Sequence, residues 1–126
     1  MNDRPDATEL LEIARRTLLD ELLPRLPDEL RYSTLMIANA MAIASREHAA
    51  GDAAASAELA RLHELYGEAQ QTLAGSALYT VLSSYNRRLG ADIRAGRCDG
   101  WAGLRDHLAQ TTADKLAVAD PKVLAR

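Results

Sequence analysis

Apolar residues recur at helical spacing in five segments of the chain. The first segment begins at Asp6, and Glu9 three residues later completes a capping-box pattern for the free amides of the first turn. Pro24 and Pro27 end this segment, because neither can donate the next backbone hydrogen bond. The residues at helical spacing within it are Leu10, Ile13, Ala14, Thr17, Leu18 and Leu22.

The second segment runs from about Asp28 to Ala49, with Gly51 as its C-terminal stop and Asp52 as the next N-cap. It carries two apolar stripes, which together form a wide apolar surface. Such a surface is typical of a helix near the centre of a bundle. One stripe is Leu30, Ile37, Met41 and Ala44, and the other is Tyr32, Met36, Ala40 and Ile43.

The third segment begins near Ala53, falters at Gly67 and continues as a weaker helical turn to Ala74. Gly75-Ser76 then forms a break and a new cap, before a fourth segment that ends at "RAGRCDG". The third segment is predicted to bury Leu59, Leu62, Leu65 and Tyr66. The fourth has a nearly heptad rhythm, made by Leu78, Leu82, Tyr85, Leu89 and Ile93.

The fifth segment runs from about Gly100 to Ala119. Asp120-Pro121 ends it, because a residue before proline disfavours the helical conformation. The last five residues, "KVLAR", are predicted to be extended. The face predicted for this segment is Trp101, Leu104, Leu108, Thr112 and Leu116.

These segments predict an all-α fold, a single-domain bundle of about five helices spanning residues 1–126, with a short lead 1–5 and a tail 120–126. Ala and Leu dominate the apolar residues, whereas Phe is absent and β-branched residues are few. That mixture favours helix over strand. The short connections predict that successive helices pack antiparallel.

Charge and hydropathy narrow the functional classes. The formal net charge is −3 and the pI is near 5.6, which argues against nucleic acid or an anionic membrane as partner. The uncharged stretch 32–45 is too short to span a bilayer. The opening "MNDRPDATEL" is polar and does not resemble a signal peptide. We therefore expect a cytoplasmic bacterial protein.

Catalytic and metal motifs are not evident in the sequence. His48, His63 and His107 are isolated from one another, and none forms the i,i+4 pair of a helical zinc site. Cys98 is the only cysteine, between Arg97 and an opposing aspartate. We expect no metal, no resident cofactor and no stand-alone enzyme, since a nucleophile–base pair is not evident.

The central apolar segment contains one amide and ends in the charge pair Arg46-Glu47. Asn39 lies seven residues from both Tyr32 and Arg46, so these three share one side of the predicted helix. A buried amide without a partner costs on the order of 1–3 kcal/mol. Asn39 therefore either bonds Asn86 or a backbone group and fixes helix register, or contacts a partner or ligand.

A further set of polar residues follows the predicted core position Tyr85. Arg94 lies seven residues beyond Arg87, which places both on one side of the fourth segment. The candidate residues for a partner or ligand surface are, in full, Asn39, Arg46, Glu47, Asn86, Arg87, Arg94 and Asp99.

Four stretches come in the same order as in a known family. They are "RPDATELLEIA", "ANAMAIASRE", "YNRRLGADIRAGRCD" and "HLAQTTADKLAVADPKVL". Through them, nearly the whole chain resembles a family of small bacterial helical proteins described as a domain of unknown function. The final Asp-Pro departs from the Asn-Pro of that family.

The resemblance implies a function. Members of the family are typically encoded beside an aminoglycoside-phosphotransferase-like kinase and an acyl-CoA dehydrogenase. One relative is the small subunit of the levulinate-pathway kinase, which phosphorylates a 4-hydroxyacyl-CoA. By this resemblance we expect a non-catalytic subunit that binds and activates such a kinase, with ATP and magnesium on the kinase chain.

Two other functions stay open from the residues: a homo-oligomeric interaction module, and a carrier that holds acyl-CoA between helices. CoA carries phosphates, which arginine can clamp. Arg46 could contribute to such a surface if the second and fourth segments are neighbours. The alternative is a solvated face paired with Asp92 and Asp99. The arginines concerned are Arg87, Arg88, Arg94 and Arg97.

Overall fold

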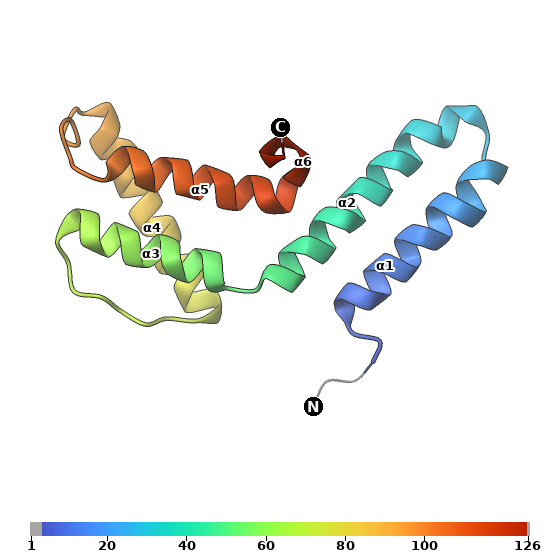
Figure 1. The fold of residues 1–126 in the computed structure, drawn as a ribbon, viewed down its shortest axis with the longest axis horizontal. Helices are drawn as coiled ribbons and strands as arrows, with labels where there is room; N and C mark the ends of the chain where they lie inside the picture. The colour runs from blue at the N-terminus through green and yellow to red at the C-terminus, as the bar shows by residue number, and fades with distance from the viewer. Residues whose placement is uncertain (1–3, 126) are drawn as a thin grey trace. The chain divides into compact units, whose positions relative to one another are not determined.

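The computed structural model describes residues 4–125, and it confirms the predicted all-α class. Within this range the chain forms six helices and no strand, and five of the helices have seven or more residues (Figure 1). The helices are α1 (Ala7–Thr17), α2 (Arg31–Ala50), α3 (Ala53–Tyr66), α4 (Gly75–Arg94), α5 (Leu104–Ala119) and α6 (Pro121–Leu124).

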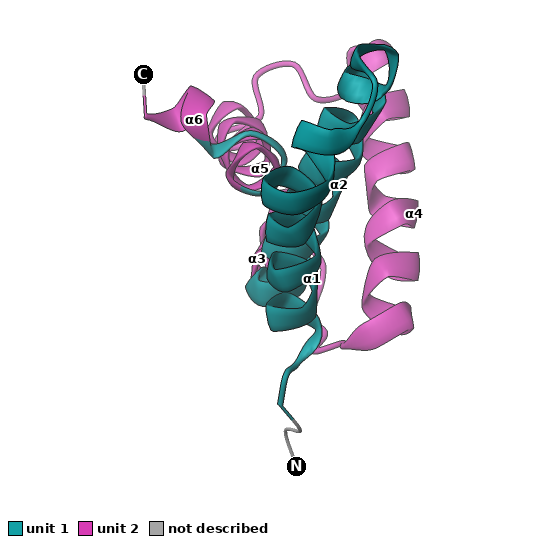
Figure 2. Cartoon of the chain, turned by 90° about the vertical axis from the view of Figure 1, so that its right-hand side faces the viewer, with its two compact units in different colours: residues 1–51, 118–121 teal, residues 52–117, 122–126 magenta. Residues whose placement is uncertain are grey.

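The chain divides into two compact units, coloured separately in Figure 2. Unit 1 comprises residues 1–51 and 118–121, and unit 2 comprises residues 52–117 and 122–126. The domain bounds expected from the sequence stay a prediction. No helix of the described chain is both long and apolar enough to cross a membrane.

Unit 1 contains a hairpin of α1 and α2, which run side by side in opposite directions (Figure 1). The predicted cap of α1 is confirmed, since Asp6 Oδ1 accepts a hydrogen bond from the backbone N–H of Glu9 at 2.9 Å. The α-helix ends earlier than predicted, at Thr17. A π-helical turn, Leu18–Leu22, and two 3₁₀ turns, Leu23–Arg25 and Asp28–Leu30, then lead into α2.

The buried face of α2 is not the one that its apolar residues predicted. Most members of the two predicted stripes are exposed or half-buried. Small side chains allow the backbones of two packed helices to approach closely, whereas large ones are left at the flanks. The buried side chains of α2 are Thr34, Ala38, Ala42 and Ser45, spaced by three or four residues.

Unit 2 has a core at the positions that the sequence predicted for α3 and α4. Leu62 and Leu78 are both 0% exposed, and Cys98 is buried among the leucines. Burial raises the pKa of the Cys98 thiol, and Asp92 and Asp99 add to this effect. Cys98 is therefore a core side chain. The core leucines are Leu59, Leu62, Leu78, Leu82 and Leu89.

The connection from α3 to α4 differs from the prediction. Gly67 ends α3 in the left-handed region, at φ 66°, and the backbone N–H groups of Gly67 and Glu68 close the helix with a Schellman pattern. Residues 68–74 then form no helical turn, contrary to the prediction. Gln70 Nε2 instead donates to the carbonyl of Ala60 at 3.1 Å, and Leu73 packs against the core.

The start of α3 and the C-terminal tail also differ from the prediction. Asp52 lies at the N-cap of α3, yet its side chain makes no capping bond there. Its carboxylate instead accepts from the hydroxyl of Tyr79 at 2.8 Å and from the N–H of Gly75 at 3.5 Å, at the start of α4. The tail predicted as extended contains the short helix α6, because Pro121 is favourable at a first helical position.

Candidate functional site: an exposed face of α2 and a pocket of unit 2

An apolar stripe of α2 lies exposed in unit 1. Tyr32 is 74% exposed and Met36 is 49% exposed. Asn39 follows at the next helical position and is also exposed. We call these three residues the Tyr32 face. Tyr and Met are enriched where proteins meet, and positions i, i+4 and i+7 are those by which a helix presents anchors to a partner.

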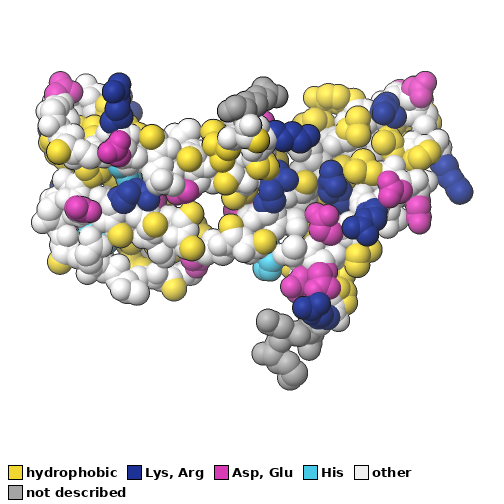
Figure 3. All heavy atoms as spheres, viewed as in Figure 1, with side chains coloured by type: hydrophobic (Ala, Val, Ile, Leu, Met, Phe, Trp, Pro, Cys, Tyr) yellow, Lys and Arg dark blue, Asp and Glu magenta, His cyan; other side chains and the backbone are white. Residues whose placement is uncertain are grey.

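Other large apolar residues of unit 1 are also exposed, and hydrophobic side chains reach the surface over α1 and α2 in Figure 3. Single exposed apolar residues are ordinary, but this number on a two-helix hairpin indicates a surface that a partner can cover. The residues are Leu10, Ile13, Leu22, Leu30, Leu35 and Ile37.

Asn39 does not fix the register of a buried helix, and that interpretation was wrong. Its side chain is exposed, and Asn86 bonds elsewhere. The physical reason is that α2 buries its stripe of small residues and not its large apolar one, so that Asn39 lies outside the buried face. The alternative interpretation, contact with a partner or ligand, stays a prediction.

Arg46 has structural partners in unit 1. Its Nε donates to the carbonyl of Val118 at 2.7 Å, and Nη2 donates to the carbonyl of Ala119 at 3.5 Å. These carbonyls belong to the last turn of α5, where a basic side chain is favourable. Two nitrogen atoms of the guanidinium are therefore occupied by hydrogen bonds to the backbone of the same chain. Glu47 beside it is exposed. Binding roles for both residues stay predictions.

Asn86 contacts a buried carboxylate in unit 2. Its Nδ2 donates to Oε2 of Glu58 at 3.2 Å, and Glu58 is 7% exposed. The amide therefore satisfies a charged group that has little access to water. Asn86 therefore has a structural contact within unit 2, and the partner role expected for it stays a prediction.

Replacing Asn86 by leucine is expected to destabilise the protein by roughly 1–3 kcal/mol, because the buried oxygen of Glu58 loses its hydrogen bond. Urea denaturation followed by circular dichroism measures the change. The matched control is Arg87→Gln, on the next residue, which is exposed and should change stability by less than about 0.5 kcal/mol. Equal stability of the two variants would show that Asn86 does not support Glu58.

Arg87, Arg94 and Asp99 are exposed. The expected pairing of arginines with carboxylates holds for their neighbours instead: Arg97 Nη1 lies 3.0 Å from Asp92 Oδ1, and Arg88 Nη1 lies 2.6 Å from Glu68 Oε1. A surface of four arginines free for phosphate is therefore not formed, since two of the four are paired.

The Arg88 guanidinium belongs to a network that joins α3 and α4. It lies 3.8 Å above the ring of Tyr66, whose hydroxyl donates to Asp92 at 2.6 Å. Tyr85 donates a short hydrogen bond to Glu68. These bonds lower the pKa of both carboxyls. The main cause for Glu68 is the hydrogen bond from Tyr85, and the main cause for Asp92 is the hydrogen bond from Tyr66.

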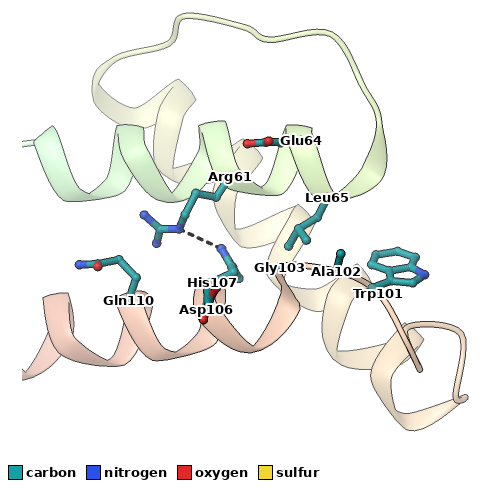
Figure 4. Close-up of a pocket in the computed structure, with 9 residues that line it drawn as sticks. All are labelled: Arg61, Glu64, Leu65, Trp101, Ala102, Gly103, Asp106, His107 and Gln110. Atoms are coloured by element: carbon teal, nitrogen blue, oxygen red, sulfur yellow. Dashed lines mark hydrogen bonds between the residues drawn. The ribbon is translucent and has the colours of Figure 1, made fainter.

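A pocket of about 510 Å³ lies in unit 2 between α3 and the start of α5 (Figure 4). Arg61 reaches across it from α3, and its Nε donates to Nδ1 of His107 at 3.1 Å. Its Nη2 donates to Oγ1 of Thr111 at 3.1 Å. Leu65 and Trp101 lie toward the opposite end of the pocket (Figure 4).

His107 is held neutral by its surroundings. It is 3% exposed, and burial is the main cause that lowers its pKa from the ordinary value of 6.5. The charge of Arg61 lowers it further, whereas Glu58 opposes the effect. A neutral imidazole with a free lone pair on Nδ1 is the form that can accept the hydrogen bond from Arg61.

This arrangement predicts that acidification weakens the fold before the carboxylates titrate. The unfolded chain protonates His107 near pH 6.5, whereas the folded protein resists protonation until a lower pH. The unfolded state thus binds more protons in this window, so stability falls as pH falls, by at most about 1.4 kcal/mol per pH unit. Urea denaturation between pH 7.5 and pH 5, roughly the range in which His titrates, measures this slope.

His107→Gln should flatten this slope, since glutamine can accept from Arg61 but does not titrate. The control is His48→Gln, at an exposed position of α2, which should keep the slope of the wild type. A slope that is the same in all three proteins would contradict the assignment to His107.

The sequence predicted neither the pocket nor the burial of His107. Arg61 and His107 are 46 residues apart, and helical periodicity placed Leu108, not His107, on the buried face of α5. Leu108 is 42% exposed. Only the packing of α3 against α5 brings this pair together.

The fold and these two features define an all-α protein with an exposed helix face and a pocket lined by both polar and apolar side chains. Across residues 4–125, no group of three His, Cys, Asp or Glu side chains could hold a metal ion. The chain belongs to the family described as Domain of unknown function (DUF6285), which matches residues 24–123. The matched range includes the Tyr32 face and the pocket. No curated protein and no solved structure matches the chain.

Proposed function

We propose that this chain is a non-catalytic accessory subunit that binds and activates a phosphotransferase-type kinase acting on a hydroxyacyl-CoA. The observation that supports it is the Tyr32 face, where a tyrosine and a methionine lie exposed on one side of a regular helix. The kind of kinase and its substrate rest on the family resemblance. ATP and magnesium belong to the kinase chain in this proposal.

The proposed contact buries the Tyr32 face against the kinase. A tyrosine supplies a large contact area at a small cost in side-chain entropy, and methionine adapts to irregular surfaces. Asn39, beside them, can donate and accept hydrogen bonds at the edge of the contact. The role of the chain is to stabilise an active arrangement of the kinase. For this role the chain needs a rigid helix, and it needs no catalytic group.

The family resemblance implies a phosphotransferase-like kinase encoded beside the gene, and co-expression with such a kinase tests the proposal. The two chains should co-purify, and phosphorylation of a 4-hydroxyacyl-CoA should be faster with both chains than with the kinase alone. A kinase that runs at its full rate alone, and that does not associate with this chain, would refute the proposal.

A second copy of the chain could cover the same face, which is the homo-oligomeric alternative. Light scattering after size-exclusion chromatography separates the two ideas. A monomer that becomes a hetero-complex on adding the kinase supports the accessory subunit. A stable homo-oligomer that does not take up the kinase supports the interaction module.

A further inference from the structure

The pocket of unit 2 contains an arginine whose hydrogen-bond acceptors are both neutral. Arg61 is half-buried, and its guanidinium donates to a neutral imidazole and to a hydroxyl, each at 3.1 Å. These bonds fix the plane of the guanidinium against α5. A guanidinium fixed in this way is preorganised to bind an anion through its remaining N–H groups.

Nothing in the described part of the chain neutralises this charge by direct contact. Ion pairs there join Arg4, Arg88 and Arg97 to carboxylates, and none includes Arg61. Both N–H groups of Nη1 and one of Nη2 are not used by His107 and Thr111. They form the fork that matches a planar carboxylate.

The other half of the pocket is apolar. The side chains of Leu65, Ala102 and Trp101 lie along it, away from the guanidinium (Figure 4). The volume of about 510 Å³ is in the range of pockets that hold small organic molecules. A ligand that fits both halves has an anionic head and an apolar body.

The charged residues at the rim of the pocket favour an anion with one negative charge over an anion with two. Glu64 and Asp106 also line the pocket, and both are exposed. Together with Arg61 they give the lining a net negative charge, so that a dianion such as phosphate is repelled more strongly than a monoanion. A carboxylate, with one charge and two coplanar oxygens, suits the site better.

We propose that this pocket binds a small monocarboxylate with an apolar body, with the carboxylate on Arg61 and the body against Leu65 and Trp101. The site lies in unit 2, whereas the Tyr32 face lies in unit 1, and the proposal does not depend on a kinase partner. It gives the chain a ligand site of its own, through which an organic acid could regulate it.

Trp101 makes the proposal directly measurable, because it is the only tryptophan of the chain and lines the pocket. Tryptophan fluorescence of the full chain is titrated with 4-methylpentanoate, with 4-methylpentanamide and with inorganic phosphate at constant ionic strength. The carboxylate should give a saturable change. The amide and phosphate should bind more weakly by about ten-fold or more, since hydrogen bonds to charged groups are the stronger ones.

Arg61→Gln should reduce the affinity for 4-methylpentanoate to that of the amide. Arg105→Gln removes the same charge from an exposed position of α5 outside the pocket and should bind as the wild type does. Thermal melts show whether each variant is folded. If Arg61→Gln does not fold, Arg61→Lys keeps the charge without the fork, and should bind the carboxylate more weakly than the wild type.

Equal binding of 4-methylpentanoate and its amide by the wild type would overturn the proposal whatever the variants do. Tighter binding of phosphate than of the carboxylate would also overturn it, since the rim charges would then not select as argued. A wild type whose fluorescence responds to none of the three would likewise show that the pocket takes no such acid.

Discussion

Replacing Met36 by lysine is expected to weaken association with the proposed kinase partner by roughly 30-fold or more while leaving the chain folded. Met36 lies in the middle of the Tyr32 face and is half exposed, so the lysine reaches water in the free protein. In the complex its charge would be desolvated at the centre of the contact. Central positions of an interface cost about 2 kcal/mol or more when changed, a loss of roughly 30-fold in affinity. Calorimetric titration of the kinase measures it.

The matched control is His48→Lys, near the end of α2. His48 is exposed, so the same charge enters an accessible position, but about 120° around the helix from Met36 and off the Tyr32 face. It should bind the kinase with an affinity close to that of the wild type. Equal loss in both variants would indicate a contact that is not centred on the Tyr32 face.

The variant Asn39→Leu tests whether Asn39, on the same face, contributes to stability or to binding of the partner. The amide is exposed, and leucine is a good helix former, so stability should change by less than about 0.5 kcal/mol. Affinity for the kinase should fall if the amide bonds the partner. A fall in the melting temperature with unchanged affinity would return Asn39 to a structural role.

The core of unit 2 was predictable because α3 and α4 follow the simple rule of helical amphipathicity. Leu59, Leu62, Leu78, Leu82 and Leu89 were predicted from spacing alone, and all five are buried. Each of these helices packs one leucine-rich face against the other. The hydrophobic effect then acts on the same residues that periodicity selects.

The hairpin of unit 1 was not predictable in this way. Its apolar residues are more numerous than two packed helices can bury, and periodicity does not say which of them are left outside. The packed face of α2 is Thr34, Ala38, Ala42 and Ser45, which are small and partly polar. Their spacing was visible in the sequence, but small residues carry a weak hydrophobic signal, whereas Tyr32 and Met36 carry a strong one.

The candidate site residues also differ in whether the sequence alone could identify them. Asn39 was identified from the sequence, because an amide within an apolar run is a local anomaly, although its burial was predicted wrongly. Asn86 was identified as polar beside the core, but its partner Glu58 was not. The pocket residues Arg61 and His107 gave no local signal, because their relation exists only in the folded chain.

Truncating Leu62 to alanine is expected to be among the most destabilising single changes in the chain. Leu62 is 0% exposed within the leucine core of unit 2. Its removal loses both the transfer free energy of the side chain and the contacts around the cavity that remains, about 2–5 kcal/mol for such a change. That cost is a large part of the roughly 5–15 kcal/mol that stabilises a typical domain.

Urea denaturation followed by the fluorescence of Trp101 measures this change, because Trp101 packs against the same core and reports the unfolding of unit 2. The control is Leu108→Ala, the same substitution at a residue of α5 that is 42% exposed, which should cost less than about 1 kcal/mol. The sequence alone assigned both leucines to packed faces and so predicts similar costs. A large difference between the two variants therefore supports the packing of α5 through His107, whereas equal costs would favour the face that periodicity selected.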